Sequence, residues 1–94
     1  VLHCPTIKPL DEATILAEVR KPGRLVVVAE NHSVIGGLGE AVAGLLLREG
    51  AAPAKFRMLG LPDAFLDAGA LPTLHDRYGI SAEKVAASLK AWLA

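Results

Sequence analysis

The feature that most constrains the fold is the uninterrupted apolar run Leu25–Ala29, with the sequence LVVVA. A strand with one face in water alternates apolar and polar residues, whereas a strand covered by helices on both faces is apolar throughout. Residues Gly37–Glu49 follow with apolar side chains at helical spacing, and Gly50 is suited to end that helix. This order predicts a buried strand of a parallel sheet, followed by a crossover helix.

Weaker signals place the other elements along the chain. Asp11 is a suitable N-cap for one helix, and Ser81 for the last helix, whose buried stripe we expect to contain Val85, Leu89 and either Trp92 or Leu93. We expect a three-layer α/β/α fold with three strands in this chain. The remaining expected elements are the end of an extended segment at Val1–Cys4, a helix at Asp11–Arg20, a loop at Asn31–Gly36, a strand at Lys55–Leu59, an interface-sized loop at Gly60–Ala70 and a short helix at Leu71–Tyr78.

Composition narrows the possible partners. Lysine plus arginine and aspartate plus glutamate both number 10, so no net charge attracts nucleic acid or an anionic membrane, and we expect neither as a partner. A hydrophobic content of 52% is high for 94 residues and predicts contact with another domain or subunit. Cys4 is the only cysteine, which favours a reducing compartment, and the start of the sequence lacks signal-peptide features; we expect a cytoplasmic location.

The carboxyl end of the first predicted strand carries the candidate ligand or interface residues, Glu30 and His32. An acid and an imidazole beside a helix N-terminus suit acid/base chemistry or half a metal site, but hydrogen bonding to loop amides or to a neighbouring domain is the favoured interpretation. The turn Gly36–Gly39 resembles a phosphate-binding turn, but Val42 stands where that pattern needs glycine or alanine. We therefore expect the glycines to allow tight helix packing there. We also expect no catalytic, cofactor-binding or metal-binding residue in the chain.

Several motifs follow one another along the chain: Thr6–Asp11 (TIKPLD), Gly23-Arg24, Glu30-Asn31-His32, Gly36–Val42 (GGLGEAV), Leu59–Phe65, Gly69 and Tyr78–Ile80. Together, in this order, they resemble the C-terminal domain of transketolases. The resemblance covers nearly the whole chain, and only Asn31 departs from it, because the family often has an acid or another residue there. The front half is shared with the beta subunits of 2-oxo acid dehydrogenase E1 components and with deoxyxylulose-phosphate synthases, whereas the tail favours transketolase.

The resemblance implies a mixed, mostly parallel sheet and a domain over residues 1–94 that lacks its first strands and helix. It also implies that a strand from preceding sequence lies between Val1–Cys4 and Leu25–Ala29. The parent enzyme would transfer two-carbon ketol units between sugar phosphates, with thiamine diphosphate and a divalent metal such as Mg held by its other domains. Its partners would be other transketolase domains or subunits in a homodimer or heterotetramer. The alternatives are the C-terminal domain of an E1 beta subunit or of a deoxyxylulose-phosphate synthase, or an independent small-ligand-binding α/β module.

Overall fold

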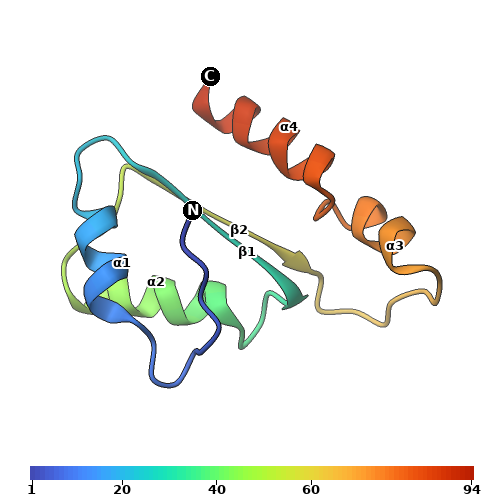
Figure 1. Ribbon diagram of the computed structural model, residues 1–94, viewed down its shortest axis with the longest axis horizontal. Coiled ribbons are helices and arrows are strands. Elements are labelled where there is room, and N and C mark those ends of the chain that lie inside the picture. The colour runs from blue at the N-terminus through green and yellow to red at the C-terminus, as the bar shows by residue number, and fades with distance from the viewer.

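The computed structural model describes residues 1–94, and its helices and strands follow the expected order (Figure 1). Both predicted caps are confirmed: Asp11 Oδ1 accepts a hydrogen bond from the Thr14 amide, and Ser81 Oγ accepts one from the Lys84 amide, both at 3.3 Å. The elements are α1 (Glu12–Val19), β1 (Leu25–Ser33), α2 (Leu38–Arg48), β2 (Lys55–Leu61), α3 (Leu71–Arg77) and α4 (Ala82–Leu93).

The sheet consists of β1 and β2, which pair in parallel from Leu25 opposite Lys55 to Ala29 opposite Leu59. After an irregularity the pairing resumes at Ser33 opposite Leu61. Both strands are therefore longer than expected, and the expected loop at Asn31–Gly36 is wrong in its first residues. Mutual backbone pairing, which the side-chain pattern does not reveal, extends the strands into this polar stretch.

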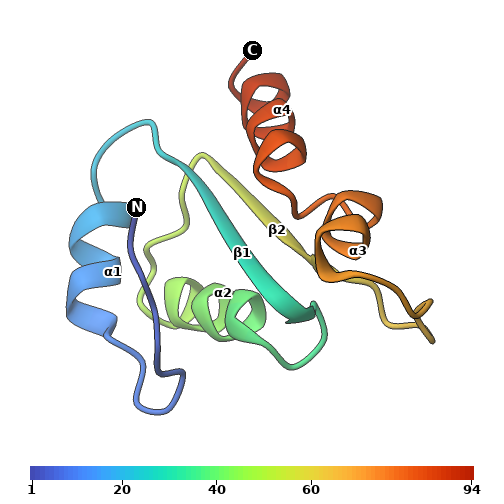
Figure 2. The ribbon, with the colours of Figure 1, turned by 45° about the vertical axis from the view of Figure 1, so that its right-hand side comes forward.

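The three expected layers are confirmed. Helices α1 and α2 cover one face of the sheet, and α4 runs along the other face, while α3 lies beyond the carboxyl ends of the strands (Figures 1 and 2). The buried core lies between the sheet and the α1–α2 layer. It consists of Ile15, Val19, Val28, Val42, Leu45, Leu46 and Ala51.

Three expectations about this sheet are wrong in detail. The segment Val1–Cys4 is in neither a helix nor a strand, so the sheet has two strands rather than three. Of the run Leu25–Ala29 only Val28 is buried, and α4 has no buried residue, so its stripe is half-buried at best. The common cause is that β1 pairs with a strand on one edge only, which leaves open space between the layers at its other edge.

Candidate functional site

Glu30 lies near the carboxyl end of β1 and reaches the first turn of α2. Its side chain is only 8% exposed, and its two carboxylate oxygens accept hydrogen bonds from the Leu38 and Gly39 amides, each at 2.8 Å. The first amides of a helix have no partner within the helix and carry partial positive charge. Glu30 supplies both the missing acceptors and the matching negative charge.

The glycines of the turn make room for this carboxylate. A Cβ on Gly37 would overlap Glu30 Oε1 and lie 2.9 Å from the Ser33 carbonyl oxygen. A Cβ on Gly39 would lie 2.7 Å from Met58 Sδ. Because real Cβ contacts are not this short, a side chain at Gly37 requires the Glu30 side chain and the backbone at Ser33 to shift, and one at Gly39 requires the Met58 side chain to shift. The expectation that these glycines allow close helix packing agrees with this geometry.

His32 lies close to Glu30 but faces solvent. Its ring is 61% exposed, with Nδ1 at 3.7 Å from Glu30 Oε1 and 2.8 Å from the Ser33 carbonyl oxygen. Since a carbonyl only accepts, Nδ1 carries the proton in this contact. The structure brings the two candidate residues together, with Glu30 engaged by backbone amides and His32 available at the surface.

This arrangement does not suit a cofactor diphosphate. The N-terminus of α2, where a glycine-rich turn would bind a phosphate, already holds the Glu30 carboxylate. A phosphate there would meet a largely buried negative charge instead of free amides. The residues at this turn therefore do not fit the diphosphate end of thiamine diphosphate.

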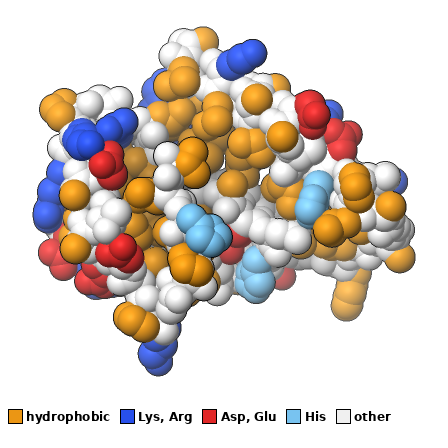
Figure 3. Space-filling view, viewed as in Figure 1, with side chains coloured by type: hydrophobic (Ala, Val, Ile, Leu, Met, Phe, Trp, Pro, Cys, Tyr) orange, Lys and Arg blue, Asp and Glu red, His pale blue; other side chains and the backbone are white.

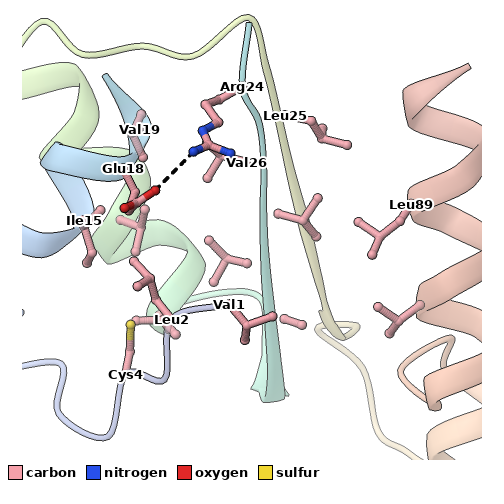
Figure 4. A pocket seen from close by; sticks show the side chains of 16 residues that line it. Val1, Leu2, Cys4, Ile15, Glu18, Val19, Arg24, Leu25, Val26 and Leu89 are labelled. Atoms are coloured by element: carbon pink, nitrogen blue, oxygen red, sulfur yellow. Dashed lines mark hydrogen bonds and ion pairs between the residues drawn. The ribbon is translucent and has the colours of Figure 1, made fainter. Parts of the chain in front are cut away.

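A second feature is an apolar opening of about 700 Å³ beside β1, at the place where the family resemblance implies a strand from preceding sequence. Figure 3 shows hydrophobic side chains in the hollow between the N-terminal part of the molecule and α4. Every layer contributes to the walls, which are lined by Val1, Leu2, Cys4, Ile15, Glu18, Val19, Arg24, Leu25, Val26, Val27, Val28, Ala29, Leu38, Val42, Val85 and Leu89 (Figure 4). We call this cavity the β1 slot.

The β1 slot runs along the unpaired edge of β1. Five consecutive strand residues, Leu25–Ala29, line it, while β2 occupies the opposite edge of the strand. The segment Val1–Cys4 forms another wall and does not join the β1 ladder. A five-residue strand with its side chains occupies roughly 800 Å³, given the usual strand rise, strand spacing and layer thickness. The slot thus follows five residues of the β1 edge and has approximately the volume of one strand.

One ion pair borders the slot. Glu18 Oε2 lies 3.2 Å from Arg24 Nη2 (Figure 4), and Glu18 Oε1 lies 2.9 Å from Lys21 Nζ. The hydrogen bond from Lys21, reinforced by its charge, holds the pKa of Glu18 below its ordinary value of 4.5. The side chains of Glu18 and Arg24 are exposed at the surface and give the otherwise apolar slot one polar end.

Neither a metal cluster nor a membrane span is present among residues 1–94. No group of three or more His, Cys, Asp or Glu side chains is placed to hold a metal ion. None of the helices has the length and apolarity needed to cross a bilayer.

Comparison with known proteins identifies the class of the domain. The family model described as "Transketolase, C-terminal domain" matches residues 1–85. The chain therefore belongs to the transketolase family and corresponds to its C-terminal domain.

Individual relatives agree with this assignment. A transketolase family protein of Sinorhizobium fredii is 73% identical over 93 residues, which are 99% of this chain and 27% of the relative. A 1-deoxy-D-xylulose-5-phosphate synthase of Syntrophotalea carbinolica is 42% identical over 87 residues, 93% of this chain and 13% of the relative. Among solved structures, a split gene transketolase in an inactive beta4 tetramer has a TM-score of 0.74 and 36% identity, over 94% of this chain and 27% of that chain. The chain thus spans about a quarter or less of each of these proteins.

Proposed function

We propose that this chain is the C-terminal packing and assembly domain of a cytoplasmic transketolase that transfers two-carbon ketol units between sugar phosphates. The family assignment and the 73% identical transketolase relative support the activity. Thiamine diphosphate and its divalent metal, for example Mg, would be bound by other domains, since Glu30 occupies the one helix N-terminus here that resembles a phosphate site. The cofactor would supply the stabilisation of the carbanion formed during ketol transfer.

The β1 slot is the observation that carries the packing role. The unpaired edge of Leu25–Ala29 lines an apolar cavity, and covering its backbone groups without giving them hydrogen-bond partners would cost about 1–3 kcal/mol for each group. A strand from sequence outside this chain would pair with β1 and fill the cavity. We therefore propose that residues 1–94 are a domain without its first strands and helix, completed by the rest of the enzyme.

Thiol labelling of Cys4, followed by mass spectrometry of the peptide that contains it, tests this completion, because Cys4 lines the slot and is the only cysteine among residues 1–94. In the full-length protein a filled slot should slow the reaction of Cys4 with a thiol reagent by about 100-fold or more relative to the denatured protein. The matched control is the double variant Cys4→Ser/Leu47→Cys, whose thiol lies on the exposed face of α2 and should react freely. Equal reactivity of the two thiols in the native protein would show that the slot stays open.

The activity needs a separate assay. Purified enzyme with its cofactors should exchange ketol units between sugar phosphates. The alternative is a 1-deoxy-D-xylulose-5-phosphate synthase, favoured by the 42% identity to an enzyme of that name. Formation of 1-deoxy-D-xylulose 5-phosphate without ketol exchange would support that alternative and refute the transketolase proposal.

Assembly with other copies or with other transketolase subunits, as a homodimer or heterotetramer, is part of the proposal. The solved split gene transketolase is a tetramer of its beta subunits, and a quarter of that subunit matches this chain. We propose that Glu30 stabilises the fold and that His32, exposed at the edge of the sheet, lies at a contact with another domain or subunit. An independent small-ligand-binding module is disfavoured because Glu30 occupies the expected ligand position.

A further inference from the structure

The last third of the chain forms an arm that leaves β2 and returns along the second face of the sheet. We call residues 62–94 the C-terminal arm; it consists of the loop after β2, α3 and α4 (Figures 1 and 2). Contacts inside the arm tie its parts together. The Asp67 carboxylate pairs with Arg77 between the loop and α3, and Ser81 Oγ donates a hydrogen bond to Asp76 Oδ1 at 3.1 Å between α4 and α3.

Two cations of β2 contact the far end of this arm. Lys55 Nζ donates a hydrogen bond to the Trp92 carbonyl oxygen at 2.8 Å, and the Arg57 guanidinium lies 5.9 Å from the centre of the Trp92 ring. Residues two apart on a strand point to the same face, so one face of β2 presents both cations to the last turn of α4. We call Lys55, Arg57 and Trp92 the clasp.

The clasp supplies the polar contacts between the arm and the rest of residues 1–94. No other hydrogen bond and no ion pair joins residues 62–94 to residues 1–61. Apolar packing of α4 is loose as well, because none of its residues is buried, and Val85 and Leu89 line the β1 slot. The docking of α4 therefore depends on the clasp more than the docking of a buried helix would.

Each half of the clasp has a physical reason to favour the docked position. The carbonyl groups in the last turn of a helix lack partners within the helix and carry partial negative charge, which suits the Lys55 ammonium. A guanidinium close to an indole face is attracted by the negative face of the ring. Both interactions exist only while α4 lies against the sheet, so they act on docking and not on the helix itself.

We propose that the C-terminal arm opens and closes over the second face of the sheet and that the clasp fastens it in the closed position. The arm pivots after Leu61, where β2 ends. Because Val85 and Leu89 of α4 line the β1 slot, the closed arm covers the strand that fills the slot. The inference rests on the proposed function only for the presence of that strand.

Native-state hydrogen exchange of the full-length protein tests the clasp. An isolated helix of 12 residues is marginal in water, so the α4 amides exchange when the arm opens. Lys55→Met/Arg57→Leu should speed exchange across the whole of α4 by about 10-fold, while α2 changes less than 2-fold. The matched control is Lys90→Met, which removes a cation in the last turn of α4 that lies outside the clasp and should speed α4 exchange less than 3-fold.

A variant on the other side of the clasp covers the case in which the β2 variant fails to fold. Trp92→Leu removes the ring and should speed α4 exchange by about 3-fold or more. Arg57→Leu should then add nothing further in the Trp92→Leu protein, because its partner is gone. Fully additive effects of these two substitutions would contradict the clasp.

Other outcomes would also overturn the proposal. Unchanged α4 exchange in Lys55→Met/Arg57→Leu would show that something else fastens the arm, and equal acceleration by Lys90→Met would show a general effect of charge. Acceleration confined to the last turn of α4 would indicate fraying of the helix end and no opening of the arm. Cys4 labelling is measured in parallel: a freely reactive Cys4 in a protein whose α4 responds to the clasp variants would refute the proposed completion of the sheet and leave the clasp standing.

Discussion

Replacement of Gly37 by alanine provides a direct test of how β1 and α2 are joined. The new Cβ would overlap Glu30 Oε1 and lie 2.9 Å from the Ser33 carbonyl oxygen. The backbone of Gly37 is extended, with φ −104° and ψ −160°, so alanine adopts it without strain and the effect is steric. Overpacking of this kind costs typically 1–3 kcal/mol.

Displacement of Glu30 adds to this cost. The carboxylate would be pushed away from the Leu38 and Gly39 amides, and a hydrogen bond to a charged group contributes about 1.5–3 kcal/mol. Partial loss of these bonds together with the overpacking gives an expected destabilisation of about 3 kcal/mol for Gly37→Ala. That corresponds to roughly 150-fold more frequent opening of the first turn of α2.

Native-state hydrogen exchange of the full-length protein measures this opening at the amides concerned. The start of α2 should exchange about 150-fold faster in Gly37→Ala than in wild type, provided that exchange follows the opening equilibrium. In the double variant Gly37→Ala/Glu30→Ala the clashing carboxylate is gone, so the combined cost should be at least 1 kcal/mol less than the sum of the single costs. Unchanged exchange in Gly37→Ala, or strictly additive costs, would refute the role assigned to Glu30.

Three further predictions concern other positions. Gly44→Ala should stabilise α2 by about 0.5–1 kcal/mol, because only the flexible end of Arg48 lies near the new Cβ. The stabilisation would be measured as slower amide hydrogen exchange across the helix. Faster exchange would mean that α2 is packed more tightly there than the structure shows. The lowered pKa of Glu18 stabilises the folded protein above pH 4.5, and this contribution is lost as the pH falls through the lower folded value. Unfolding midpoints of wild type and Glu18→Gln should therefore differ at pH 7 and converge in acid, and a constant gap would contradict the ion pair. His32→Ala should raise KM or weaken assembly while leaving kcat nearly unchanged, and a loss of several orders of magnitude in kcat would reveal a catalytic histidine.

The sequence alone determined the order and type of every helix and of both strands, because these depend on local signals. Asp11 and Ser81 cap helices through short-range hydrogen bonds, and Gly50 adopts a positive φ at the end of α2 as its position suggested. The apolar run Leu25–Ala29 marked the first strand for the same reason. The family resemblance was also present in the sequence, since its motifs depend on residue order.

The tertiary structure decided which residues meet and which surfaces stay open. Glu30 and the amides of Leu38 and Gly39 are separated by eight and nine residues, and only the turn between β1 and α2 brings them together. The apolar pattern of Leu25–Ala29 indicated burial on both faces, but burial depends on neighbours that the pattern does not specify. With β2 on one edge of β1 and the slot on the other, only Val28 of this run is buried, and an apolar space remains at the edge where the family resemblance implied another strand.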